Sequence, residues 1–108
     1  MALELKQREH AGTYIIQAEG EVDLYSSPAL RETLLKAIPN ATVKVCVDLS
    51  GVAYMDSSGV ATLVEGLKAA TKAAIAFVLA TPSPPVMRVL ELSRLNTVFT
   101  IEEIPETL

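Results

Sequence analysis

The sequence predicts an α/β fold with a mixed, mostly parallel sheet of about five strands, an antiparallel edge hairpin at the N-terminus and roughly three to four flanking helices. Segments with strand patterns alternate with segments with helix patterns, which is typical of parallel strands joined by helical crossovers. A short turn separates the first two strand segments, so these two are expected to pair antiparallel. Residues 74–80 (AIAFVLA) form a continuous apolar run of strand length, as in strands buried on both faces.

The first two strands form the predicted hairpin. Leu3 and Leu5 alternate with charged residues, which is the period-two pattern of a half-buried strand. Residues 9–12 (EHAG) are predicted to be a turn, and residues 13–20 (TYIIQAEG) are rich in residues that favour strands. This hairpin is expected to supply the antiparallel edge of the sheet.

A first helix and a third strand are expected next. Ser27 is a candidate N-cap, and Pro28 suits the first helical position because its missing N–H would have no partner there. The residues predicted to share the buried helical face are Leu30, Leu34, Leu35 and Ile38. Residues 39–41 (PNA) are expected to end this helix. In the strand predicted at residues 43–50, one face is expected to hold Val43, Val45, Val47 and Leu49.

The second half of the chain continues the alternation. A helix is expected to begin within residues 56–59, because the apolar residues that follow have helical spacing: Val60, Leu63, Val64 and Leu67. Residues 74–80 are the fourth strand, residues 86–92 a third helix, and residues 97–101 a last strand. The turn after Lys72 contains no glycine, although a helix C-terminus usually recruits one. The acidic ending at residues 102–108 either adds a helical turn or frays.

Length and composition predict a single domain over residues 1–108 and exclude several classes of protein. The single cysteine, Cys46, excludes an intrachain disulfide and a two-cysteine zinc site, and favours a reducing compartment. No basic stretch precedes an apolar run, and no apolar run reaches the ~20 residues that span a bilayer, so we expect a cytoplasmic protein without membrane insertion. A net charge of −4, scattered basic residues and the absence of tryptophan argue against direct nucleic-acid binding.

The segment Asp56–Ser57–Ser58–Gly59 is the strongest candidate site. The simplest interpretation is a helix start, because Ser and Asp side chains accept from free N–H groups there. A serine nucleophile needs a nearby base, and the only histidine, His10, falls in the predicted hairpin turn. No glycine-rich phosphate-binding motif can be formed. We therefore expect no catalytic residues, no bound metal and no cofactor in this chain.

A serine in this position can instead act as a switch. A phosphate on Ser57 or Ser58 would lie at a helix N-terminus, while Asp56 and any other nearby carboxylate would repel it. Loops at the carboxyl ends of parallel strands meet at one edge of a sheet, so the loop around Asp23 is expected beside this segment. Together they predict one acidic, serine-bearing surface.

Three segments of the sequence resemble the STAS domains of bacterial anti-sigma factor antagonists, also called anti-anti-sigma factors. They are GEVDLYSSPALRETL, VDLSGVAYMDSSGVATL and SPPVMRVLELSRLNTVFTI, and the resemblance covers nearly the whole chain. The block DLSGV-x-x-MDSSG is the most specific of its motifs. The fold that this family implies, a small mixed sheet with flanking helices, agrees with the order of elements above.

The resemblance also implies a function by partner switching. The antagonist binds an anti-sigma factor that is a serine kinase and thereby frees a sigma factor; phosphorylation of the serine matching Ser57 ends the contact, and a metal-dependent serine phosphatase restores it. ATP and Mg²⁺ belong to the kinase. Asp23 matches the aspartate of the family's G-E-L-D motif, in which Val22 replaces the usual leucine. The implied partner-binding residues are therefore Asp23, Asp56, Ser57, Ser58 and Gly59, with Ser57 as the phosphorylation site and Ser58 as a capping residue.

An alternative stays open, because STAS domains also serve other systems. One is the small cytoplasmic STAS subunit of lipid-transporting (phospholipid, Mla-like) ABC transporter complexes, which docks on the transporter's ATPase. Some of those subunits retain the D-S-S-G block, so the motif does not separate the two functions. STAS domains attached to anion carriers are a third group, but no membrane segment accompanies the domain in this sequence.

Overall fold

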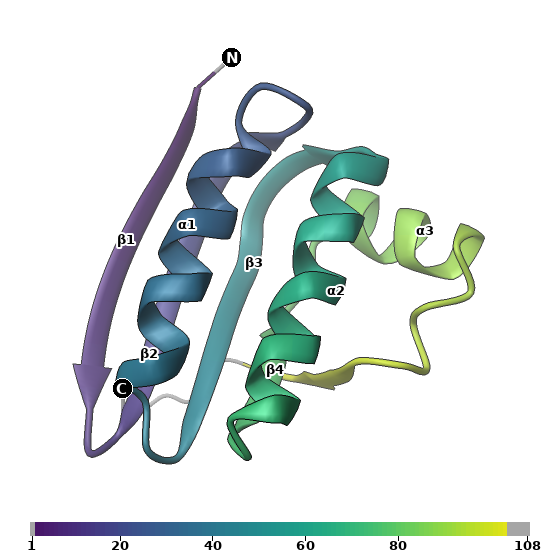
Figure 1. Ribbon diagram of the computed structural model, residues 1–108. Helices are drawn as coiled ribbons and strands as arrows, with labels where there is room; N and C mark the ends of the chain where they lie inside the picture. Colours follow the sequence, from purple (N-terminus) through teal and green to yellow (C-terminus); the bar gives the residue numbers. More distant parts are fainter. Residues whose placement is uncertain (1, 104–108) are drawn as a thin grey trace.

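The computed structural model describes residues 2–103, which form one five-stranded sheet with three α-helices (Figure 1). In chain order the elements are β1 (Leu3–His10), β2 (Thr13–Val22), α1 (Ser27–Ala37), a 3-10 turn (Ile38–Asn40), β3 (Lys44–Met55), α2 (Ser57–Lys72), β4 (Ala76–Ala80), α3 (Pro84–Leu92) and β5 (Thr100–Glu102). This order confirms the predicted alternation of strands and helices.

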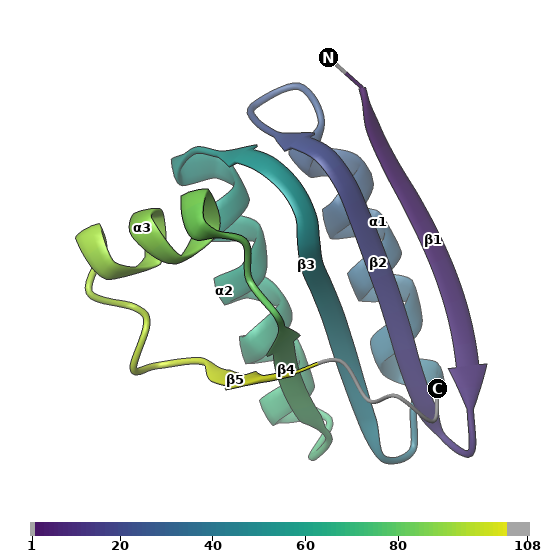
Figure 2. The ribbon, with the colours of Figure 1, turned by 180° about the vertical axis from the view of Figure 1, so that it is seen from behind.

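The strands lie in the sheet in the same order as in the chain. Strands β1 and β2 are antiparallel, and β2, β3, β4 and β5 are parallel to one another, which confirms the mixed, mostly parallel sheet. Helices α1 and α2 lie side by side over one face, and the view from behind shows the strands in front of them (Figure 2). Fully buried side chains fill the space between these two layers, among them Ile16, Leu30, Leu34, Val47, Leu63 and Leu79.

The register of β2 and β3 positions the site. Two irregularities, between Gln17 and Glu19 and between Gly20 and Glu21, shift the pairing of β2 with β3. As a result the last residues of the two strands, Val22 and Met55, are paired. The chain therefore leaves both strands at the same level of the sheet.

Several predicted boundaries are wrong in detail. The third strand continues five residues beyond Ser50 to Met55, and Val43 lies before it with half of its side chain exposed. The last strand is Thr100–Glu102, because residues 97–99 form a turn. Helix α1 begins at Ser27, so Ser26 is the residue before the helix. The chain end, predicted as a helical turn or a frayed segment, lies outside the described residues from residue 104 onward.

The glycine-free turn after α2 uses an alanine where glycine is usual. Ala74 has a left-handed backbone (φ 61°), and the N–H of Ile75 donates to the carbonyl of Ala70 (3.0 Å). These are the features of a Schellman C-cap, whose left-handed residue is most often glycine. A residue with a Cβ is strained in that conformation, so Ala74 lowers the stability of the fold slightly compared with glycine.

Candidate functional site

Two loops at the carboxyl end of the sheet form the candidate site. One follows β2 at Asp23, and the other follows β3 at Asp56. The backbone N–H of Asp56 donates to the carbonyl of Val22 (3.2 Å), so the two loops are joined directly. The structure thus confirms that the Asp23 loop and the Asp56–Gly59 segment are neighbours.

Asp56 is the N-cap of α2. Its backbone is extended (φ −110°, ψ −170°), and its Oδ1 accepts a hydrogen bond from the N–H of Ser58 (2.9 Å). The hydroxyl of Ser58 donates to the same oxygen. The prediction that Ser58 caps the helix is therefore wrong: Ser58 is a donor to the cap. A carboxylate suits this role because it accepts from two donors and carries the charge that a helix N-terminus favours.

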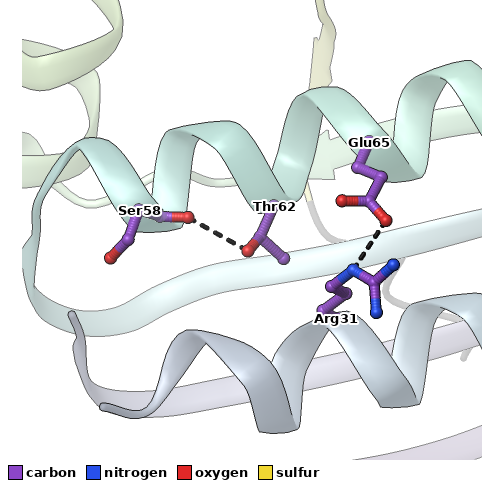
Figure 3. Close-up of polar contacts among 4 residues, drawn as sticks. All are labelled: Arg31, Ser58, Thr62 and Glu65. Carbon is purple, nitrogen blue, oxygen red and sulfur yellow. Dashed lines mark hydrogen bonds and ion pairs between the residues drawn. The ribbon is translucent and has the colours of Figure 1, made fainter. Parts of the chain in front are cut away.

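The two serines of the segment differ in their surroundings. Ser57, the first residue of α2, is exposed, and its hydroxyl makes no hydrogen bond within residues 2–103. Ser58 is half-buried with its hydroxyl engaged by Asp56, and its carbonyl accepts from the hydroxyl of Thr62 (3.0 Å; Figure 3). The hydroxyl of Ser57 is therefore accessible, whereas that of Ser58 is engaged by Asp56.

Gly59 is a packing position. A Cβ at this residue would lie 2.6 Å from Cγ of Met55 and 2.9 Å from Cγ1 of Val22, closer than real Cβ atoms approach. The missing side chain lets the first turn of α2 rest directly on the ends of β2 and β3. Gly59 is buried, so it fixes the position of Ser57 rather than offering a surface of its own.

The Asp23 loop is closed by reciprocal hydrogen bonds. Asp23 Oδ1 accepts from the backbone N–H groups of Tyr25 and Ser26, both at 2.9 Å. In return, Ser26 Oγ accepts from the N–H of Asp23 (2.9 Å) and donates to the carbonyl of Glu21 (2.7 Å). Sequence reasoning missed Ser26, although an Asp three residues before a Ser is a signal for such reciprocal bonding.

The two loops carry acidic side chains and no basic ones. Residues 20–30 and 50–59 contain three carboxylates, Glu21, Asp23 and Asp56, and no lysine or arginine. Hydrogen bonds, chiefly from the backbone of Ser26, hold the pKa of Asp23 below its usual value, so it is ionised at neutral pH. The next basic residue along α1, Arg31, pairs with Glu65 of α2 (2.6 Å; Figure 3). The charges of these two loops are therefore all negative.

A groove runs from Ser57 along α2. It has a volume of about 490 Å³, and its lining includes Val60, Val64 and Leu95 beside Ser57. Glu65 and Lys68 also line it, so apolar and charged side chains lie together next to the exposed hydroxyl.

The only histidine of the chain lies far from the site. His10, the only histidine of the chain, pairs with Thr13 at the start of β2, a whole strand length from Ser57. Within residues 2–103, no three His, Cys, Asp or Glu side chains are grouped so that they could hold a metal ion. In the same part of the chain, no helix has the length and apolar character needed to cross a membrane.

Comparisons with known proteins agree with this arrangement. The family model described as "Mlab, STAS domain" matches residues 5–103. An anti-sigma-B factor antagonist of Staphylococcus epidermidis is 38% identical over 69 residues, which span 64% of this chain and 64% of that relative. An anti-sigma-B factor antagonist of Listeria monocytogenes is 28% identical over 104 residues, 96% of this chain and 90% of that relative.

The fold also matches a solved structure. The anti-sigma factor antagonist SpoIIAA in its unphosphorylated form superposes with a TM-score of 0.81 at 24% identity, covering 96% of this chain and 90% of that chain. The mixed five-stranded sheet with three helices is therefore the fold of that structure.

Proposed function

The chain belongs to the STAS domain family, and we propose that it is an anti-sigma factor antagonist controlled by phosphorylation of Ser57. In this proposal the unphosphorylated protein binds an anti-sigma factor that is a serine kinase, which frees a sigma factor. Phosphorylation of Ser57 ends the contact, and a serine phosphatase restores the binding form. ATP and Mg²⁺ are bound by the kinase.

The contrast between the two serines carries the proposal. Ser57 is exposed with a free hydroxyl within residues 2–103, whereas the hydroxyl of Ser58 is bonded to Asp56. In the proposed reaction Ser57 Oγ attacks the γ-phosphorus of ATP, a base of the kinase takes its proton, and ADP leaves. Hydrolysis by the phosphatase returns the hydroxyl and releases inorganic phosphate.

The surroundings of Ser57 favour release after phosphorylation. A phosphoserine adds a charge of about −1.5 to −2. Asp23 and Asp56 already make this surface negative, and the partner still holds the anionic ADP. Because the side chain of Ser57 is exposed and has no core contact to lose, the added charge weakens the complex without unfolding the domain.

Mass spectrometry tests the site. The protein is incubated with a purified anti-sigma serine kinase of the same genome and with Mg-ATP. We expect the mass increment of one phosphate in the wild type and in the matched control Ser58→Ala, and none in Ser57→Ala. An increment that survives Ser57→Ala overturns the assignment of the site, and no increment with any such kinase overturns the switch.

The variant Ser57→Asp tests the role of charge. It should bind the kinase more weakly while melting close to the wild type, since a negative charge is tolerated at a helix N-terminus. Equal binding would mean that charge at Ser57 is not the switch.

A second candidate is favoured by the description of the matching family model, which names Mlab. In this proposal the chain is the STAS subunit of a lipid-transporting ABC complex and docks on its ATPase. Co-purification with an ATPase and a permease, together with complementation of an outer-membrane defect by Ser57→Ala, would support it. Failure to co-purify would exclude it.

A further inference from the structure

Strand β1 lies at the edge of the sheet with one side free. It pairs with β2, and within residues 2–103 no second strand lies against its other side. The strand at the opposite edge, β5, has three residues, whereas β1 has eight. Of the two sheet edges, β1 therefore offers the longer row of unpaired backbone N–H and C=O groups to another strand.

Strand β1 lacks most of the features by which edge strands avoid such pairing. Short length, proline and β-bulges are common protections. Strand β1 contains no proline, and its eight residues pair with β2 in consecutive register without a shift (Figure 2). Its remaining protection is charge, which prevents pairing where like signs meet. The charged residues of β1 are Glu4, Lys6, Arg8 and Glu9.

Three of these charged side chains share one face of the sheet. Leu3 and Leu5 pack against the core between the sheet and the helices, so the residues that alternate with them point to the other face. These are Glu4, Lys6 and Arg8. All three are exposed, and none makes an ion pair or a hydrogen bond in the part of the chain that the structure describes. Their charges are therefore available to a neighbouring strand.

Symmetry limits the ways in which two copies can pair through β1. A two-fold axis perpendicular to the sheet pairs β1 with β1 antiparallel and places side chains of the same face opposite each other, so that one residue faces itself on the axis. With Glu4, Lys6 or Arg8 on the axis, that charge faces its own copy. With Gln7 on the axis, Lys6 faces Arg8 twice. Among these central positions of β1, only Leu5 on the axis brings opposite charges together without like ones, because Glu4 then faces Lys6 at two places.

The register around Leu5 also brings apolar side chains together. Leu5 faces Leu5 of the second copy, and Leu3 lies two residues away on the same face. Both leucines are half-buried at the margin of the core. Directly opposite side chains in an antiparallel pair have Cβ atoms about 4.5–5.5 Å apart, so the second copy would cover more of this apolar area.

We propose that the free side of β1 is a self-association surface, at which a second copy of this chain adds its own β1 antiparallel around Leu5. The product is a two-fold dimer with one continuous sheet, in which Glu4 of each copy faces Lys6 of the other. This inference does not rest on the proposed function. The candidate site lies on the loops after β2 and β3, and none of the residues that pair in this register belongs to it.

Sedimentation equilibrium over a wide range of concentrations tests the surface, with any purification tag at the C-terminus so that β1 is unobstructed. The wild type should change from monomer to dimer as its concentration rises. Glu4→Lys and Lys6→Glu each turn two attractive pairs into repulsive ones, so each should raise the dimer Kd about tenfold or more. The matched control is Lys68→Glu, which makes the same charge change at an exposed lysine of α2 and should leave Kd unchanged. A wild type that stays monomeric at every concentration would overturn the proposal.

A mixture of the two β1 variants gives the sharpest test. Positions 4 and 6 are both lysine in Glu4→Lys and both glutamate in Lys6→Glu, so each variant repels itself. A mixed dimer instead places lysine opposite glutamate in both pairs. The equimolar mixture should therefore associate about as tightly as the wild type, and so should the double variant that carries both changes. Failure of the mixture to associate, or a dimer that is equally tight in every single variant, would overturn the register and with it the proposal.

Amide hydrogen exchange reports on the backbone of β1. Alternate N–H groups of an antiparallel edge strand point outward, so a second strand protects them. In the wild type these N–H groups should exchange more slowly in concentrated than in dilute solution, whereas in Lys6→Glu the concentration should have no effect. Circular dichroism should show the same fold in all variants, because every substituted side chain is exposed. Exchange in the wild-type β1 that does not depend on concentration would count against the dimer.

Discussion

Replacing Gly59 with alanine is expected to disturb the site through packing. The new Cβ would lie 2.6 Å from Cγ of Met55 and 2.9 Å from Cγ1 of Val22. The Met55 side chain is flexible and can move, but Val22 belongs to β2 and is fully buried. The strain is therefore relieved mainly by moving the first turn of α2 away from the sheet, and Ser57 moves with it.

Two opposing terms set the effect on stability. Alanine is favoured over glycine in a helix by about 0.5–1 kcal/mol. Inserting a methyl group into a packed core costs about 1–3 kcal/mol. The free energy of unfolding should therefore fall by about 0–2.5 kcal/mol. With a urea m-value of about 1–3 kcal/mol/M, a loss of 1 kcal/mol lowers the midpoint by about 0.3–1 M.

The matched control is Gly66→Ala, in the middle of α2. Its Cβ would lie 2.9 Å from Cζ of Phe77 and 3.0 Å from Cε1, so it is similarly crowded but about two and a half turns from Ser57. Urea unfolding should show a comparable stability change in both variants, while only Gly59→Ala should slow phosphorylation of Ser57 by the kinase. If Gly59→Ala instead raised the free energy of unfolding by about 0.5–1 kcal/mol, and its Ser57 were phosphorylated as fast as in the wild type, the reasoning would be refuted.

Further predictions concern the turns, the thiol and one carboxylate. Ala74→Gly should raise the free energy of unfolding by about 0.5–1 kcal/mol, because glycine adopts the left-handed conformation without strain; a lower urea midpoint would contradict this. Asp56→Ala should lower the free energy of unfolding by about 1 kcal/mol through loss of the cap, and an unchanged urea midpoint would argue against that cap. Cys46 is buried and burial raises the pKa of its thiol, so iodoacetamide should modify it only when the protein unfolds; rapid modification of the native protein would contradict this. The fold lowers the pKa of Asp23. The stabilisation that the Asp23 carboxylate provides is therefore complete above its usual pKa of 3.8 and is lost as the pH falls through the lower pKa of the folded protein. The amide signals of Tyr25 and Ser26 should shift in NMR spectra only in that acidic range.

The arrangement of elements could be predicted from the sequence because its signals are local. The alternation at Leu3 and Leu5, the helical spacing after Gly59 and the apolar run before Thr81 each indicate one element, and the alternation of strands with helices then predicts a mostly parallel sheet. Because loops at the carboxyl ends of parallel strands meet at one edge of the sheet, the Asp23 loop was expected beside the Asp56 segment. That neighbourhood is the part of the site that topology alone determines.

The remaining details depend on contacts that the sequence does not display. The last part of β3 contains Gly51 and no regular alternation, and it is a strand because β2 pairs with it as far as Met55. Conversely, residues 97–99 have strand-like side chains but form a turn, and pairing with β4 begins at Thr100. The choice of Asp56 over Ser58 as the cap likewise depends on backbone geometry.

The structure also limits how phosphorylation could act. A phosphate that reorganises a protein usually does so by binding a nearby arginine or lysine. The two loops offer none, and Arg31 is already paired with Glu65 on the neighbouring helix. Ser57 lies on a helix whose first turn is fixed by the Asp56 cap and by the close contact of Gly59 with β2. The two loops themselves therefore offer a phosphate on Ser57 no basic partner, and the first turn of the helix that carries it is held in place. A protein that covers this surface would meet that charge directly, because the side chain of Ser57 is exposed.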